Sequence, residues 1–291
     1  MKKLLITGAS GFVGKHIYDV CTNRGYEVHG LTTSASNNFI KCDITEEGQV
    51  KQVFDQINPD IVIHSAGLAS VTNGLPIDYY KINVIGTDNI LKTLVSFREK
   101  KRLIFLSTAG VYGNQKINVL HEKLTPSPVH HYGFSKMVAE HLVLLQADKI
   151  NFTILRLFNL IGNGQNESFI LPKLIRHFKE KLPQIELGNI EPERDYISVL
   201  TAVDIIEKII SNKSSFGEVI NLCSGHGTSV RSLIEVLTSI TGHQLNVISS
   251  PDFIRKNEVW RLVGDVEKLV SITGNPAVLP DIRNSISSMI I

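Results

Sequence analysis

The sequence predicts an α/β fold in which a doubly wound parallel sheet is joined by a smaller mixed α/β lobe. Short runs rich in β-branched residues alternate with longer segments of helical period through roughly the first half of the chain, as expected for parallel strands with crossover helices. The 291 residues are 43% hydrophobic, which is enough for one such domain and an appended lobe. After Asn159 the alternation loosens, so the second half is interpreted as the smaller lobe.

The individual elements follow from these patterns. Apolar residues recur at helical spacing from Val13 to Cys21, and Gly25 ends that helix. The expected strands of the sheet are 3–7, 27–32, 40–42, 60–65, 102–107 and 151–157, and the expected later helices are 169–182, 198–211 and 229–241. We expect a first domain at 1–160, joined by part of 190–222, and a second lobe at 161–291, with the ligand site in the cleft between them.

Composition limits the partners of the chain. The formal net charge is +2 and no dense lysine and arginine cluster occurs, which argues against nucleic acid and anionic membranes as partners. Cys21, Cys42 and Cys223 have no metal-ligand spacing, so we expect reduced core cysteines and no metal. The apolar run at 4–6 is too short for a signal peptide, so a cytoplasmic location is expected.

A glycine-rich segment, Thr7-Gly8-Ala9-Ser10-Gly11-Phe12-Val13-Gly14, follows the first expected strand and opens the first expected helix. Gly8 permits a tight turn, Gly11 lets backbone N–H groups approach a phosphate, and Gly14 lets the helix pack closely on the strand. This setting predicts a Rossmann-type dinucleotide site. The expected cofactor contacts in this segment are Gly8, Ser10, Gly11, Phe12, Val13 and Gly14.

The end of the second expected strand bears on the choice of cofactor. A carboxylate there would bind the 2′-hydroxyl of the adenosine ribose, but the chain reads Gly30-Leu31-Thr32-Thr33-Ser34. The small hydroxyl side chains, with Thr32 as the expected contact, leave room for a 2′-phosphate, although no arginine lies beside them. NADP(H) is therefore favoured, with NAD(H) as the alternative.

A tyrosine four residues before a lysine can perform acid/base chemistry on a helix, because both side chains then share one face and the ammonium lowers the tyrosine pKa. The chain contains two such pairs. Tyr112 and Lys116 lie in a segment containing glycine and asparagine, where this geometry is not enforced. Tyr132 and Lys136 lie at the start of an apparent helix, so the second pair is the candidate.

These motifs resemble the extended short-chain dehydrogenase/reductase family. Residues 7–14 match its T-G-x-x-G-F-[IV]-G, and residues 132–140 match its Y-G-x-S-K-x-x-x-E. Residues 107–113 are similar to S-[ST]-x-x-V-Y-G, residues 64–67 to H-x-A-A with Gly67 in place of alanine, and residues 80–89 to Y-x-x-N-x-x-G-T-x-N.

The resemblance implies an NAD(P)-dependent oxidoreductase that reacts through three residues. Thr108 would hydrogen-bond the reacting sugar oxygen, with Ser107 as the second choice, Tyr132 would exchange a proton, and Lys136 would hold the nicotinamide ribose. Asp43 would contact adenine; its other interpretation is a helix N-cap. Further implied cofactor contacts are Ile44, Ser65, Ala66, Gly67, Asn83, Tyr132 and Lys136.

In the second half, three segments are similar to the family's nucleotide-sugar site. Asn159 lies in an R-x-x-N-x-x-G motif, Arg194 in R-D-[YF]-[IV], and Arg255 with Glu258 in R-x-x-[DE]. The resemblance implies that Asn159 and both arginines lie at the diphosphate, since a guanidinium can bind two phosphate oxygens, and that Glu258 contacts the ribose. The single tryptophan, Trp260, is expected to pack, with base stacking as the alternative.

Family members with this machinery are epimerases, dehydratases or ketoreductases. A dehydratase usually carries Asp-Glu after the catalytic threonine, whereas this chain has Ala109-Gly110. The resemblance therefore implies reduction of the C4 ketone of a dTDP- or GDP-linked 4-keto-6-deoxyhexose, in deoxysugar biosynthesis. An NAD-dependent nucleotide-sugar 4-epimerase is the alternative, and a non-catalytic dinucleotide-binding subunit is the alternative from another class. Helices 80–97 and 132–146 are similar to those that pair in family homodimers, so a homodimer is expected.

Overall fold

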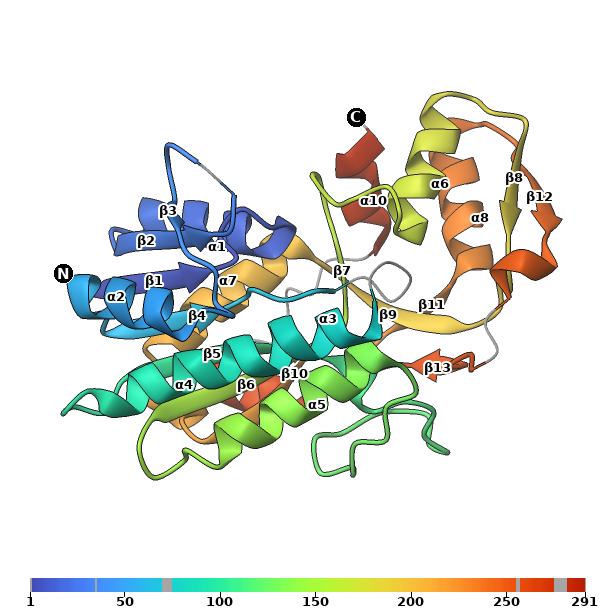
Figure 1. Cartoon of the computed structure of the whole chain (residues 1–291). Helices are drawn as coiled ribbons and strands as arrows, with labels where there is room; N and C mark the ends of the chain where they lie inside the picture. Colours follow the sequence, from blue (N-terminus) through green and yellow to red (C-terminus); the bar gives the residue numbers. More distant parts are fainter. Residues whose placement is uncertain (1, 35, 70–74, 255–256, 275–281, 291) are drawn as a thin grey trace.

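The computed structural model describes residues 2–34, 36–69, 75–254, 257–274 and 282–290. Its main body is a seven-stranded parallel sheet with helices on both faces, and a smaller lobe lies beyond the carboxyl ends of the strands (Figure 1). The predicted fold class is confirmed. The strands, in spatial order, are β10 (Glu218–Leu222), β6 (Asn151–Leu157), β5 (Arg102–Thr108), β4 (Ile61–His64), β1 (Lys3–Thr7), β2 (Glu27–Thr32) and β3 (Ile40–Lys41).

Alternate residues of each strand pack into opposite layers, because successive side chains of a strand point to opposite faces. Leu4 and Ile6 of β1 lie in one apolar core, whereas Leu5 lies in the other. The first core is covered by α1 (Phe12–Asn23), α7 (Val199–Ile210) and α9 (Glu267–Thr273). The second is covered by α2 (Glu47–Ile57), α4 (Gly86–Ser96) and α5 (His131–Leu144).

The helix expected at 80–97 begins earlier and contains an irregular turn. It starts with α3 (Pro76–Tyr80), passes through one π-helical turn, η1 (Lys81–Ile85), and continues as α4. A π turn inserts one extra residue and often occurs at functional sites. Here it carries the buried Asn83.

The smaller lobe has a core of its own, in which α6 (Ile170–Lys179), α8 (Val230–Thr241) and α10 (Ile282–Ile290) pack together (Figure 1). One parallel pair joins β8 (Gln184–Leu187) to β12 (Asn246–Ser249). A four-stranded sheet combines β11 (Gly227–Ser229), β9 (Glu193–Ser198), β13 (Arg261–Leu262) and β7 (Asn159–Ile161). Short 3-10 turns occur at η2 (Ala109–Val111), η3 (Lys213–Ser215) and η4 (Pro251–Phe253).

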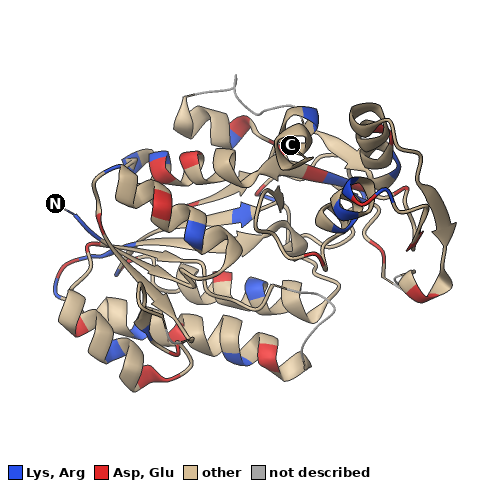
Figure 2. Cartoon of the chain, turned by 90° about the horizontal axis from the view of Figure 1, so that it is seen from above, with Lys and Arg blue, Asp and Glu red and all other residues tan. Residues whose placement is uncertain are grey.

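Other expectations about the chain can be compared with this structure. Cys21, Cys42 and Cys223 are free and buried, as predicted. Acidic and basic residues are intermingled over the helices of the main body (Figure 2). Within the described ranges, no helix combines the length and apolar character needed to cross a membrane. The domain boundary near residue 160 stays a prediction.

Candidate active site

The glycine-rich turn between β1 and α1 is shaped by close backbone contacts. Gly8 has a φ of +68°, and a Cβ on it would lie 2.7 Å from the Cα of Ala66. A Cβ on Gly14 would collide with the carbonyl oxygen of Gly8. Gly11 is the N-cap of α1, and the described residues place no side-chain cap there. The first N–H groups of α1 can therefore bind a phosphate, so the turn fits the pyrophosphate of a dinucleotide.

Hydroxyl groups lie together at the end of β2, where the sequence predicts the adenosine ribose. The Oγ of Ser10 and the Oγ1 of Thr32 are 2.8 Å apart, and the N–H of Ser34 donates to Thr32 Oγ1 at 3.3 Å. These contacts place two of the sequence-predicted cofactor residues together at the end of β2. Phe12 and Val13, in contrast, pack at the edge of the first core.

Asp43 and Ile44 follow β3. The Asp43 carboxylate accepts hydrogen bonds from the N–H and hydroxyl of Thr45, at 2.9 and 2.8 Å. The interpretation of Asp43 as a helix N-cap is wrong, because α2 begins at Glu47 with Glu46 as its N-cap. Ile44 is buried in the second core, so its side chain packs under the site.

A buried chain of hydrogen bonds joins the strands that carry the site. Ala66 N–H donates to Thr7 Oγ1, which lies 2.7 Å from His64 Nδ1, and His64 Nε2 lies 3.0 Å from Thr87 Oγ1. Thr87 donates its hydroxyl proton to the Asn83 carbonyl at 2.6 Å, so its oxygen must accept from Nε2–H of His64. Nε2 of His64 therefore carries a proton. Burial lowers the pKa of the ring to about 3, so the ring is neutral at neutral pH.

Asn83 joins the loop after β4 to α5. Its Oδ1 accepts from Leu68 N–H at 2.8 Å, and its Nδ2 donates to Ser135 Oγ at 2.9 Å. The same loop is held to β1 by Ser65, whose hydroxyl donates to the Thr7 carbonyl at 2.6 Å. A Cβ on Gly67 would lie 2.9 Å from Asn83 Oδ1, so a larger residue there would press on this amide. The predicted residues Ser65, Ala66, Gly67 and Asn83 thus lie together beside the glycine turn.

Thr108, Tyr132 and Lys136 lie together where β5 ends and α5 begins. Thr108 Oγ1 accepts a hydrogen bond from Gly110 N–H at 3.0 Å, which fixes its side chain. Burial raises the pKa of Tyr132, and a hydrogen bond with Thr108 partly opposes that rise. Tyr132 therefore holds its proton at neutral pH and can act as a proton donor.

Lys136 lies one helical turn after Tyr132 and is 4% exposed. Its Nζ lies 4.3 Å from the centroid of the Phe105 ring. Burial lowers the pKa of Lys136 to about 7, while the negative charge of Glu140 acts in the opposite direction.

A buried ion pair joins α5 to β6 next to these residues. Arg156 Nη2 lies 2.8 Å from Glu140 Oε2, and Ser107 donates its hydroxyl to Glu140 Oε1 at 2.5 Å. Ser107 is thus turned away from the side of β5 that Thr108 presents, so the second choice for the substrate hydroxyl is wrong. Sequence reasoning missed the pair, although Glu140 ends one motif of the family pattern and Arg156 begins another.

Tyr112, of the other Tyr-x-x-x-Lys pair, has a structural role. Tyr112 is fully buried, and its hydroxyl donates to Asn221 Oδ1 at 2.7 Å. Tyr112 also faces the Arg156 guanidinium across 4.8 Å. The interpretation of this pair as a decoy fits these contacts.

Residues of the expected nucleotide-sugar site line the smaller lobe. Arg194 Nη2 lies 2.7 Å from Glu258 Oε1, so the segments containing them meet in the fold. Asn159 begins β7, which pairs with β9 beside Arg194. Arg255 lies outside the described residues.

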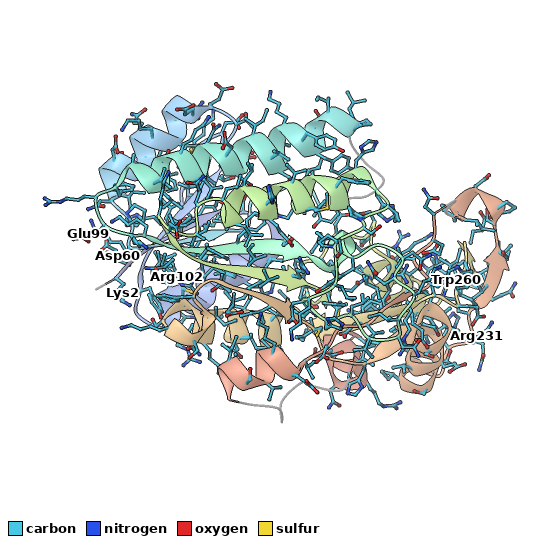
Figure 3. The ribbon with its side chains drawn as sticks, turned by 90° about the horizontal axis from the view of Figure 1, so that it is seen from below. Lys2, Asp60, Glu99, Arg102, Arg231 and Trp260 are labelled. Atoms are coloured by element: carbon cyan, nitrogen blue, oxygen red, sulfur yellow. The ribbon has the colours of Figure 1, made fainter. Side chains whose placement is uncertain are left out.

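A hollow of about 400 Å³ opens next to the Arg194–Glu258 pair. Trp260 at its rim is 56% exposed, so the expectation that it packs is wrong. Figure 3 shows Trp260 in the smaller lobe, remote from Arg102 at the amino ends of the strands. The hollow is lined by Asn114, Val129, Asn189, Ile254, Asn257, Glu258 and Trp260.

Sequence comparisons agree with this geometry. The model of the "NAD dependent epimerase/dehydratase family" matches residues 4–223. A GDP-6-deoxy-D-talose 4-dehydrogenase of Aggregatibacter actinomycetemcomitans is 38% identical over 99% of this chain and 96% of its own. A GDP-6-deoxy-D-mannose reductase of Pseudomonas aeruginosa is 30% identical over 94% of this chain and 91% of its own.

Among solved structures, RMD from Pseudomonas aeruginosa complexed with NADPH matches with a TM-score of 0.86 and 28% identity, covering 100% of this chain and 96% of its own. The family match spans both the glycine turn and the Tyr132–Lys136 pair. The chain therefore belongs to the NAD-dependent epimerase/dehydratase family, and it is an NAD(P)-dependent enzyme that acts on nucleotide sugars.

Proposed function

We propose that this protein reduces the C4 ketone of a GDP-linked 4-keto-6-deoxyhexose with NAD(P)H. One observation carries the proposal. Thr108, Tyr132 and Lys136 lie together at the carboxyl end of the sheet, beside the glycine turn that fits a dinucleotide. The names of the two relatives support the substrate class, since both refer to GDP-linked 6-deoxyhexoses and to oxidation or reduction.

When bound beside these residues, NAD(P)H would supply a hydride to C4. Tyr132 donates its proton to the C4 oxygen, and the Thr108 hydroxyl holds that oxygen in line with the donor. Lys136 holds the nicotinamide ribose and stabilises the negative charge that forms on Tyr132. His64 and Asn83 have a positioning role in this proposal, because their polar side-chain atoms bind other groups of the protein.

NADP(H) is the proposed preference. Ser10 and Thr32 offer hydroxyl groups where a carboxylate would repel a 2′-phosphate. The NADPH in the Pseudomonas structure supports this choice. NAD(H) stays the alternative, and the ratio of kcat/KM for the two cofactors decides between them.

The substrate is proposed to lie across the two lobes. Arg194 binds the diphosphate, Asn159 lies beside it, and Glu258 binds the ribose of the nucleotide. The contact of Arg194 with Glu258 supports this arrangement, because diphosphate and ribose are adjacent in the ligand. The role of Arg255 stays a prediction.

A homodimer is proposed through α3, η1 and α5. These elements lie side by side (Figure 1). They expose four large apolar side chains, namely Ile77, Ile85, Phe134 and Val138. Adjacent exposed apolar side chains of this size are typical of an interface.

The test is to mix the purified protein with NADPH or NADH and a GDP- or dTDP-linked 4-keto-6-deoxyhexose and to follow loss of the reduced nicotinamide. We expect consumption with the GDP-linked sugar. No consumption, together with bound NAD⁺ and interconversion of 4-epimeric nucleotide sugars, would replace the reductase by the 4-epimerase. Dinucleotide binding without either reaction would favour the non-catalytic subunit.

A further inference from the structure

The hollow beside the Arg194–Glu258 pair combines three kinds of surface. Trp260 contributes an exposed indole, Val129 and Ile254 contribute apolar side chains, and three asparagines contribute amides. A nucleobase has apolar faces and an edge of donors and acceptors, so it needs the same combination. The asparagines are Asn114, Asn189 and Asn257.

The backbone fixes Trp260 beside the proposed diphosphate site. Its carbonyl accepts a hydrogen bond from Glu193 N–H at 2.8 Å, and Arg194 is the next residue along β9. Trp260 directly precedes β13, which pairs with β9 in parallel. The indole is nevertheless 56% exposed. A large aromatic side chain is therefore held in place by its backbone while its ring stays accessible to a ligand.

Glu258 connects the proposed diphosphate site to the hollow. Glu258 binds Arg194 through its side chain, and its backbone carbonyl accepts a hydrogen bond from Asn114 Nδ2 at 3.2 Å. Both Asn114 and Glu258 line the hollow. If the diphosphate lies at Arg194 and the ribose at Glu258, the base enters the space in front of Trp260.

We propose that Trp260 is the stacking surface for the substrate's nucleobase and that it favours a purine over a pyrimidine. This inference rests on the proposed function and adds the residue that selects the nucleotide. The fused rings of guanine cover more of an indole than the single ring of uracil or thymine, so they gain more from stacking. The neighbouring amides offer both donors and acceptors to the base edge.

The chain offers a direct probe, because Trp260 is its only tryptophan. GDP, UDP and dTDP are titrated against the full-length protein saturated with NADP⁺, and tryptophan fluorescence is followed. Dissociation constants are measured independently by calorimetry for the wild type, Trp260→Ala and Trp260→Phe. Ile248→Ala is the matched control, since Ile248 is an exposed apolar side chain on β12 and is not part of the hollow.

We expect GDP to change the fluorescence and to bind more tightly than UDP or dTDP. Trp260→Ala should weaken GDP binding by about tenfold or more and should reduce the preference for GDP over UDP. The GDP affinity of Trp260→Phe should lie between those of the wild type and Trp260→Ala. Ile248→Ala should bind GDP as tightly as the wild type does. Circular dichroism and thermal unfolding of Trp260→Ala should match the wild type, because the indole is largely exposed.

Two results would overturn the inference. One is GDP affinity that Trp260→Ala leaves unchanged, and the other is an equal loss of affinity for GDP and UDP. Neither result concerns turnover, so the reductase proposal would stand if NADPH is still consumed with the keto sugar. The converse result is GDP binding that depends on Trp260 while the keto sugar is not reduced. That result would support the inference about Trp260 and contradict the proposed reaction.

Discussion

Glu140 on α5 and Arg156 on β6 form an ion pair of 2.8 Å in which both side chains are almost fully buried. The pair links the helix that carries Tyr132 and Lys136 to the strand beside β5. Ser107, the residue before Thr108, donates to the same carboxylate at 2.5 Å. The geometry of the proposed catalytic residues therefore depends on a charged contact that itself lies outside the reaction.

Glu140→Gln should destabilise the protein strongly, because it leaves the Arg156 guanidinium buried without its counter-charge. Breaking a buried ion pair by removing one partner costs about 3–5 kcal/mol. The double variant Glu140→Leu, Arg156→Met removes both charges and should recover much of that loss. Urea unfolding measures both changes. Equal stability of Glu140→Gln and the wild type would show that the pair does not support the fold.

The pH dependence of reduction should report Lys136. Since its pKa is lowered to about 7, the ammonium is present below that pH and is lost above it. We expect kcat/KM for the keto sugar to decline as the pH rises through about 7. Glu140 raises the pKa of Lys136, so Glu140→Gln should move the decline to lower pH in any protein that remains folded. A flat profile from neutral to alkaline pH would contradict this role for the ammonium.

His64 should make the fold sensitive to acid. Its pKa is about 3 in the folded protein and 6.5 when unperturbed, so below pH 6.5 the unfolded chain binds a proton that the folded chain does not. Stability should fall with decreasing pH at up to about 1.4 kcal/mol per pH unit from this residue.

The His64→Asn variant isolates that contribution. The difference in unfolding free energy between His64→Asn and the wild type should shrink as the pH falls from 6.5 toward 4. His131→Asn, at an exposed histidine on α5, is measured over the same pH range as the control for the loss of a histidine. Parallel pH curves for His64→Asn and the wild type would contradict a neutral buried His64.

The proposed dimer should depend on the apolar surface of α5. Val138→Glu places a charge among exposed apolar side chains and should dissociate the dimer, which sedimentation velocity measures. Leu200→Glu is the control, since Leu200 is 60% exposed on α7, a helix of the opposite layer. If the wild type sediments as a monomer, the proposed dimer is wrong.

Local patterns predicted most of the fold. The strands at 3–7 and 151–157 agree with the structure because their apolar runs are short and bounded by turn signals. The strand at 27–32 also agrees, although its sequence is mixed. The π turn at η1 could not be predicted, since residues 81–85 continue an ordinary helical pattern. Its position depends on Asn83 reaching both Leu68 and Ser135, and those contacts form only in the folded chain.

Contacts within one helix of the site could be predicted from the sequence, whereas contacts between distant segments could not. Tyr132 and Lys136 lie on one helix, so their spacing alone predicts that they meet. The meeting of Arg194 with Glu258 and the exposure of Trp260 depend on how distant strands pair in the smaller lobe. Tryptophan is usually buried, so the sequence favoured packing.

The most direct test of the reductase proposal compares Tyr132→Phe with Tyr112→Phe. NADPH consumption is measured with the GDP-linked 4-keto-6-deoxyhexose. Tyr132→Phe removes the proposed proton donor and should lower kcat by about 10²- to 10⁴-fold. Tyr112→Phe removes a hydroxyl that bonds Asn221 and should retain kcat, with some loss of stability. Undiminished turnover in Tyr132→Phe, with dinucleotide binding intact, would contradict the account.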